Sequence, residues 1–224
     1  MDISRKKKNS KKFKLFSPGD WCGNVELNWI GAPEHDFPLY ARAFHRAGKD
    51  LIESMEGYVH NDLQSLPVVF LYRHSLELYI KGIVITGFEI LSLSGEKVPA
   101  KKIVFSHKIS SMLSTVERIF RAVGWEGEGE TGIKEFQNFN DIKKLVNDIE
   151  KIDPGSYSFR YPIKKNGSSS LPKRFFFNLF DYVDLMDKLL NLLDGACLGL
   201  EVMFDDMCEA FEYMSDLRID DGDG

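Results

Sequence analysis

Four ionisable residues are clustered within the apolar stretch Phe70–Gly82. They are Arg73, His74, Glu77 and Lys81. At about 100° per residue, a helix would place all four within an arc of about 100°, together with several apolar side chains. A solvated helix face does not usually mix charges with apolar residues in this way. We therefore expect these four groups to lie inside, or at the edge of, an apolar interface.

Charges in such a place need partners, because burying an unpaired charge is costly. Arg73 and Lys81 each lie four residues from Glu77, so both can pair with it on one helix. Counting His74, three potential cations face one carboxylate, so we expect a further anion at the cluster. A phosphate, a carboxylate from another helix or a partner subunit would each supply it. The alternative interpretation is an internal salt-bridge network that fixes the register of the helix.

Two later segments carry residue types that suit phosphate chemistry. His107 follows Ser106, which is a good helix N-cap, and the helix dipole would keep its imidazole neutral. It would then act as a base or simply cap its helix. Arg160 precedes Tyr161-Pro162 on a segment that we expect to be extended. There it would either clamp a phosphate or brace the charged helix, with Tyr161 as a neighbouring binding residue.

The sequence contains little that would indicate a metal or cofactor site. No two histidines are spaced four apart, no HExxH motif occurs, and the three cysteines are far from one another. The stretch Gly127–Gly132 matches GxGxxG, but it follows a predicted helix and contains glutamates that would repel a pyrophosphate. We expect an acidic surface loop there, no metal site and no cofactor.

The pattern around these residues predicts an all-α protein, a bundle of five to six helices with an irregular N-terminal lead-in. Apolar residues recur every three or four positions over about 36–58, 68–93, 106–123, 133–152 and 173–217. Gly95, Gly124 and Pro154 would end three of these helices. Gly195 and Gly199 predict a kink or a split in the last one. The predicted organisation is a basic arm and lead-in (1–35), a helical domain (36–217) and an acidic tail (218–224).

Composition places the chain among globular proteins, with 43% apolar and 28% charged residues over 224 positions. No apolar signal region follows the basic start, and charges interrupt the longest apolar runs, so we expect no membrane association. Separate, unpaired cysteines favour a reduced, cytoplasmic setting.

The N-terminal arm is strongly basic although the net charge of the chain is −5. Seven basic residues and one acidic residue occur in 1–14. The arm would bind nucleic acid through phosphates, pair with the acidic C-terminus of a neighbouring copy, or be a mobile tail. If it binds RNA, deletion of 1–14 should weaken binding and flatten its salt dependence.

Three segments follow one another in the chain: Arg73–Gly82, Ser106–Ile109 and Phe159–Pro162. Taken together in this order, they resemble the HEPN family of helical proteins. The resemblance implies a helical bundle that commonly dimerises, in a family with many members in bacterial defence or toxin–antitoxin systems. Catalytic members are metal-independent ribonucleases with an arginine followed, after four to six residues, by a histidine. No arginine of this sequence has a histidine at that spacing.

The leading expectation is therefore a HEPN-like module that binds RNA, a nucleotide or a partner protein, with Arg73, Glu77, Lys81 and Tyr161 as binding residues. The alternative is a ribonuclease with a rearranged site made of His74, His107 and Arg160. In such a site a histidine would move the 2′-hydroxyl proton, and the arginine would stabilise the phosphorane charge. A third interpretation is a structural subunit whose charged arc faces another copy of the chain.

Overall fold

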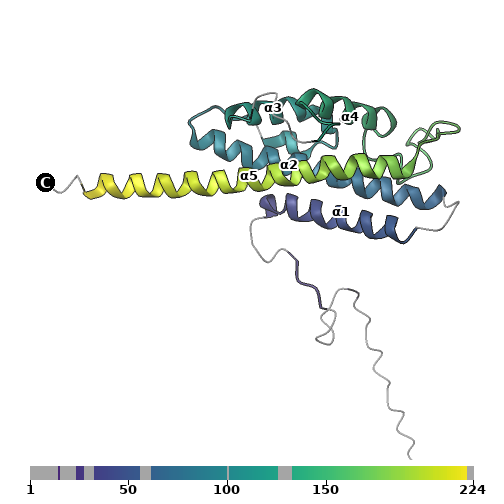
Figure 1. Ribbon diagram of the computed structural model, residues 1–224, viewed down its shortest axis with the longest axis horizontal. Coiled ribbons are helices and arrows are strands. Elements are labelled where there is room, and N and C mark those ends of the chain that lie inside the picture. The colour runs from purple at the N-terminus through teal and green to yellow at the C-terminus, as the bar shows by residue number, and fades with distance from the viewer. Residues whose placement is uncertain are drawn as a thin grey trace, which may run out of the picture. The chain divides into compact units, whose positions relative to one another are not determined.

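A computed structural model of the chain describes residues 15, 24–27, 33–55, 62–99, 101–125 and 133–220. Contacts between residues separate Met1–Ala32 from Pro33–Gly224, and the helices described here all lie in the second unit (Figure 1). The basic arm 1–14, the GxGxxG stretch 127–132 and the end of the acidic tail, 221–224, fall outside the described residues.

The described part of the chain is an all-α bundle, as the sequence predicts. Its helices are α1 (Phe37–Glu53), α2 (Ser65–Leu93), α3 (Leu113–Ala122), α4 (Phe139–Ile152) and α5 (Leu179–Asp220), with short 3-10 turns before α1, α2 and α3. Within this part β-pairing is limited to an isolated bridge between Ile163 and Ser169. None of the described helices combines the length and the apolar character that a membrane span requires.

Helix α2 is the centre of the bundle and contacts α1, α3 and α5. It is buried on nearly all sides, so the face that carries Ser75, Gly82 and Thr86 is packed and not exposed to solvent. The Ser75 hydroxyl donates to the carbonyl of Ala41 at 2.8 Å. A Cβ at Gly82 would lie 3.0 Å from Pro38, so the missing side chain lets α1 approach closely.

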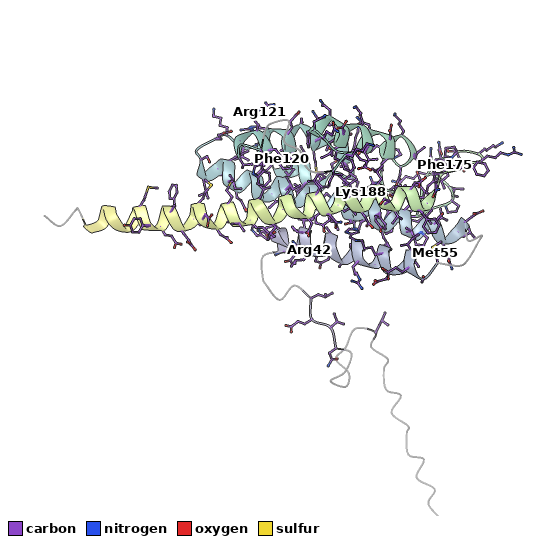
Figure 2. All side chains as sticks on the ribbon, viewed as in Figure 1. Arg42, Met55, Phe120, Arg121, Phe175 and Lys188 are labelled. Atoms are coloured by element: carbon purple, nitrogen blue, oxygen red, sulfur yellow. The ribbon has the colours of Figure 1, made fainter. Side chains whose placement is uncertain are left out.

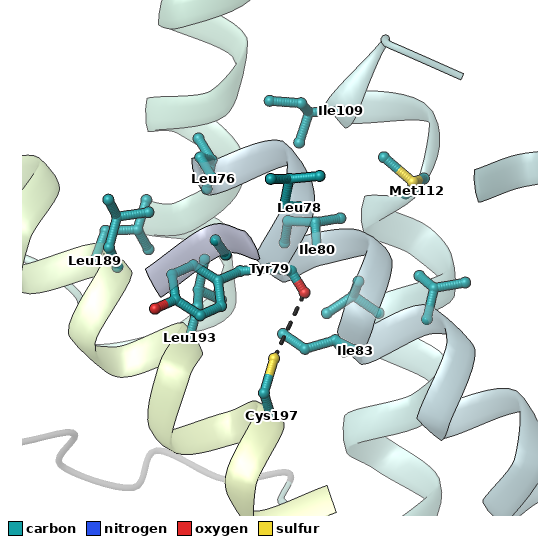
Figure 3. Close-up of a cluster of buried hydrophobic side chains, with 14 of the residues drawn as sticks. Leu76, Leu78, Tyr79, Ile80, Ile83, Ile109, Met112, Leu189, Leu193 and Cys197 are labelled. Carbon is teal, nitrogen blue, oxygen red and sulfur yellow. Dashed lines mark hydrogen bonds between the residues drawn. The ribbon is translucent and has the colours of Figure 1, made fainter. Parts of the chain in front are cut away.

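The core lies where α2 faces α5 and the short helices. Figure 3 shows Leu76, Ile80 and Ile83 of α2 near Leu189 and Leu193 of α5. On the same side, the Cys197 thiol donates to the carbonyl of Tyr79 at 3.7 Å. Cys197 is buried, and burial raises the pKa of its thiol above the ordinary value, which favours the neutral thiol and a role in packing.

Three predicted helix boundaries are wrong, each for a local reason. Ser106 starts no α-helix, because its hydroxyl accepts from Lys108 N (3.0 Å) and a 3-10 turn, Ile109–Ser111, precedes α3. Helix α4 begins later than predicted because the amide oxygen of Asn138 accepts from Asn140 N at 2.9 Å and so caps it. Helix α5 starts at Leu179 and not near 173, because Asn178 Oδ1 accepts from Phe180 N at 2.9 Å and caps it. It is a single helix of 42 residues, about 63 Å long, that passes through Gly195 and Gly199 without the predicted kink or split.

Candidate functional site

The charged cluster of α2 lies in the interior of the protein. The side chains of Arg73 and Glu77 are 0% and 1% exposed, and Lys81 is also buried. Arg73 Nη1 donates to Glu77 Oε2 at 2.9 Å, and Lys81 Nζ donates to Glu77 Oε1 at 2.7 Å. The predicted burial of these three residues and their spacing-based pairs are therefore confirmed.

Asp153, the residue that follows α4, supplies the second carboxylate of the cluster. Its Oδ2 lies 3.2 Å from Arg73 Nε, and its side chain is 1% exposed. The distance is that of an ion pair, yet neither atom has a hydrogen bond among the described residues, so the two charges face each other without good alignment. Asp153 corresponds to one of the anions that the sequence left open, a carboxylate from another helical segment. The two buried cations are thus balanced by two carboxylates, and the expected surplus of positive charge is absent.

His107 lies at the solvent edge of this cluster. Its Nδ1 is 2.8 Å from Glu77 Oε1, its carbonyl accepts from Arg73 Nη2 at 3.0 Å, and its side chain is 68% exposed. The imidazole is therefore bonded to a buried carboxylate and does not cap a helix. Burial acts to raise the pKa of Glu77, but hydrogen bonds from Lys81 and His107 outweigh it and hold that pKa below its ordinary value.

Asp153 also holds the segment that follows it. Its Oδ1 accepts from the backbone N–H of Tyr157 at 2.6 Å and of Ser158 at 2.8 Å. The Ser158 hydroxyl donates to Ile152 O at 2.8 Å, and Ser156 adopts the left-handed region with φ 59°. One carboxylate thus joins the buried cluster to a tight turn, and that turn places Arg160.

Arg160 is exposed and lies among aromatic rings. Its guanidinium carbon is 5.1 Å from the ring centroid of Tyr157, 5.4 Å from that of Phe70 and 5.6 Å from that of Tyr161. Its Nε donates to the carbonyl of Ser156, and its two Nη groups have no partner among the described residues. Arg160 therefore braces α2 through Phe70 and still presents four N–H groups to solvent.

His74 lies beside this surface and not in the buried network. Its ring stacks on Phe70 at 5.5 Å and meets the edge of Phe44 at 4.5 Å. Burial lowers the pKa of His74, and nearby cations add to this effect while Glu77 opposes it, so the imidazole is neutral at pH 7. Among the residues that the structure describes, neither a hydrogen bond nor an ion pair joins His74 to His107 or Arg160.

The predicted site residues thus form two groups. Arg73, Glu77, Lys81 and His107 meet in the buried network. His74 and Arg160 instead contact Phe70, and Tyr161 contacts Arg160. Asp153 links the two groups, and the sequence-based prediction did not include it. The stop signal Asp153-Pro154 marked only the end of a helix.

The sequence-based prediction also did not include the basic, aromatic segment that contains Arg160. Between Asp153 and Asp181 the chain has five basic residues, seven aromatic residues and no carboxylate. The basic residues are Arg160, Lys164, Lys165, Lys173 and Arg174. None of these five forms an ion pair with any residue within the described ranges. By contrast, Arg46, Lys144 and Lys151 on other surfaces are each paired with a carboxylate.

The aromatic residues of this segment cover the end of the bundle where α1 stops and where α2 and α5 start (Figure 2). Phe176 is 86% exposed, and Phe177, Phe180, Tyr157 and Tyr161 are also exposed. A cavity of about 420 Å³ lies beside Phe176, Phe177 and Phe180, and Met55, Leu66 and Phe159 also line it. A smaller apolar cavity of about 190 Å³ reaches Arg73 and Tyr182. This end of the molecule is thus cationic, aromatic and hollowed.

A second polar group lies between α1, α2 and α5 and was also missed. His45 Nε2 is 2.6 Å from Asp187 Oδ1, and the Tyr72 hydroxyl donates to the same oxygen at 3.0 Å. The nearby Arg42 donates from Nε to Asp194 at 2.6 Å. These contacts fix α1 against α5, and because their members are far apart in sequence no local spacing indicates them.

Comparisons of the chain with protein families, with curated proteins and with solved structures found no match. Within the described ranges, no group of three or more His, Cys, Asp or Glu residues is arranged to hold a metal ion.

Proposed function

We propose that this chain is a HEPN-like helical module that binds single-stranded RNA through the segment 154–180, in a bacterial defence or toxin–antitoxin unit. The observation that carries the proposal is the set of five unpaired cations in this carboxylate-free segment, interleaved with exposed aromatic rings. The HEPN assignment and the biological setting follow from the resemblance of Arg73–Gly82, Ser106–Ile109 and Phe159–Pro162.

The chemistry of the surface fits a single strand better than a duplex. Proteins that bind single strands combine cations along the backbone path with aromatic rings on which unpaired bases stack. Arg160 has free Nη groups for a phosphate, and Phe176 offers a ring that is 86% exposed. Bases in a duplex are already stacked on one another, so they cannot use such rings.

The buried network has a structural role in this proposal. Arg73 and Lys81 are neutralised by Glu77 and Asp153, so they are not available to RNA. Asp153 instead fixes the turn at Tyr157 and Ser158, which orients Arg160. The binding residues are therefore those on the surface, and the network keeps them in place.

Binding is tested by fluorescence anisotropy with labelled single-stranded and double-stranded RNA over a range of salt concentrations. The double variant Lys164→Glu/Lys165→Glu should weaken single-strand binding by about tenfold or more and flatten the salt dependence. Phe176→Ala should weaken the free energy of RNA binding by about 1–3 kcal/mol, which is the usual contribution of one base stacked on an aromatic ring. The matched control Lys143→Glu/Lys144→Glu reverses an adjacent lysine pair on α4 and should bind like the wild type.

Three results would overturn the proposal. The wild type would bind no RNA, or the control pair would lose as much affinity as the variant pair. Alternatively, anionic phospholipid vesicles would bind the wild type and compete fully with RNA, which would identify a membrane-surface site instead.

A metal-independent ribonuclease is the second candidate, and the Glu77–His107 contact favours it. The carboxylate orients the imidazole through Nδ1 and leaves Nε2 facing solvent, as in other carboxylate–histidine pairs that move protons. In this reaction His107 would take the 2′-hydroxyl proton, the resulting oxygen would attack the adjacent phosphorus, and the 5′-oxygen would leave with a proton. The products would be a 2′,3′-cyclic phosphate and a 5′-hydroxyl.

Incubation of the protein with RNA in EDTA separates the two candidates. Cleavage that is lost in His107→Ala but kept in the matched variant His35→Ala would establish the ribonuclease. Loss of cleavage in His74→Ala and Arg160→Ala as well would place all three residues in the reaction. If RNA is bound and remains intact, binding without cleavage is the function.

A further inference from the structure

A carboxylate lines the cavity of about 420 Å³, although segment 154–180 beside it contains none. It belongs to Asp62, in the 3-10 turn Asp62–Gln64 that precedes α2. The Ser65 hydroxyl donates to the backbone carbonyl of Asp62 at 2.6 Å and so fixes this turn. Among the residues that the structure describes, neither a hydrogen bond nor an ion pair engages the Asp62 carboxylate. Both of its oxygens are therefore available to accept from a ligand.

The remaining walls of this cavity are mainly aromatic and apolar. Phe176 of segment 154–180 and Phe180 at the start of α5 both line it. Figure 2 shows Met55 and Phe175, two further lining residues, at the same end of the bundle. The volume lies within the range of about 300–1,000 Å³ that is usual for pockets that bind small organic groups. The cavity thus has the size and the ring surfaces to hold one unstacked nucleobase.

A free carboxylate in such a pocket discriminates among the RNA bases, because an ionised carboxylate only accepts hydrogen bonds. The Watson–Crick edge of guanine presents two neighbouring donors, N1–H and the N2 amino group, which match the two carboxylate oxygens. Adenine and cytosine each present one amino group beside a ring nitrogen that is an acceptor. Uracil presents one N–H between two carbonyl oxygens. In these three bases an acceptor would face the carboxylate and repel it, so guanine is the base that fits.

Two of the unpaired cations lie next to this cavity in the chain. Lys173 and Arg174 separate Pro172 from Phe175, and both of these flanking residues line the cavity. The phosphates on either side of an inserted base would therefore lie near positive charge. This attraction offsets the repulsion between the RNA backbone and the Asp62 carboxylate.

We propose that this cavity binds one unstacked guanine base of a single-stranded RNA and that Asp62 is the residue that selects it. The two Asp62 oxygens accept from N1–H and from the N2 amino group, while the phenylalanine rings of the cavity cover the faces of the base. The inference rests on the proposed binding of RNA by segment 154–180, and it adds the base preference of that site.

Fluorescence anisotropy with labelled oligouridylates that differ at one central base tests the preference on the wild type. The strand with guanosine should bind at least about fivefold more tightly than strands with adenosine, cytidine or uridine, as is usual for a good bidentate contact to a base. Inosine differs from guanosine only by the missing N2 amino group. The inosine strand should therefore bind with an affinity between those of the guanosine and uridine strands.

Asp62→Asn should change the preference and not merely weaken binding. The asparagine side chain presents one acceptor and one donor, which match the amino group and the ring nitrogen of adenine. This variant should therefore bind the adenosine strand more tightly than the guanosine strand, a gain that a misfolded protein would not show. Its affinity for the uridine-only strand should not fall, since a negative charge is removed.

Asp181→Asn is the matched control. Asp181 is an exposed residue in the first turn of α5 and does not line the cavity, so its loss removes the same charge without changing the base contact. This variant should keep the preference for guanosine. Loss of the preference in Asp181→Asn, or its persistence in Asp62→Asn, would remove Asp62 as the selecting residue.

The wild-type measurements separate this inference from the proposed function. Equal affinity for all the strands would overturn the guanine pocket and leave RNA binding in place. Binding to none of the strands would overturn both together.

Discussion

Nε of Arg73, in the middle of α2, lies 3.2 Å from Oδ2 of Asp153, the residue that ends α4. The same carboxylate accepts two backbone N–H groups through its other oxygen. One side chain thus neutralises a buried arginine and fixes the turn that leads to Arg160. Asp153 therefore joins the interior network to the cationic surface. A substitution in the network should also alter the position of Arg160.

Loss of the Asp153 charge should destabilise the fold strongly. Asp153→Asn keeps an oxygen for the two backbone N–H groups but leaves Arg73 with one carboxylate instead of two. Removing one partner of a buried pair typically costs about 3–5 kcal/mol, so we expect a loss of about 3 kcal/mol in the free energy of unfolding. Asp148→Asn breaks an exposed pair with Lys151 and should cost less than about 1 kcal/mol. Urea denaturation measures the free energy of unfolding of both variants. An equal loss in the two variants would contradict the bridging role of Asp153.

The stability of the protein should depend on pH through Glu77. Its pKa in the folded state is lowered, so the unfolded state binds the proton more readily. This stabilisation is complete above the ordinary glutamate pKa of about 4.3 and is lost as pH falls below it, through the folded pKa. Wild type should therefore exceed Glu77→Gln in stability at pH 7, by a margin that narrows below about pH 4. A stability difference between wild type and Glu77→Gln that stays constant down to pH 3 would show that the Glu77 charge does not stabilise the fold.

His74 should titrate below the usual range for histidine. Burial between Phe44 and Phe70 lowers its folded pKa, so the neutral form contributes stability above the unfolded pKa of about 6.5. That contribution is lost as pH falls from there toward the folded pKa. An NMR titration of the imidazole should give a midpoint below 6.5, and His74→Gln should reduce the fall in stability between pH 7 and 5. A midpoint at or above 6.5 would be incompatible with this environment.

Alanine substitutions at two helical glycines should change the stability of the protein in opposite directions. A Cβ at Gly87 would lie 2.5 Å from the side chain of Ile119, so Gly87→Ala should overpack the contact between α2 and α3 at a cost of about 1–3 kcal/mol. A Cβ at Gly195 would meet nothing, so Gly195→Ala should gain about 0.5–1 kcal/mol from helix propensity. Thermal unfolding distinguishes them. A neutral Gly87→Ala would mean that α3 can move away without penalty.

Sequence alone was enough to predict the helical class, the central helix and the local pairs of its charges. Helix α2 was recognisable because apolar residues and helix stops are local signals, and Glu77 pairs with Arg73 and Lys81 because a helix fixes residues four apart side by side. The ends marked by Gly95 and Gly124 were predictable for the same reason, since both adopt positive φ angles.

Which distant groups meet depends on how the helices pack against one another. Asp153 and His107 reach the cluster through the packing of α4 and of the 3-10 turn, and no spacing in the sequence encodes such a contact. The same packing also determines how the buried charges are balanced. With Asp153 present the charges of the buried network are balanced, so this network offers no surplus cation to a ligand. Charge balance is a property of three-dimensional neighbours, whereas helix formation depends mainly on residues close in the chain.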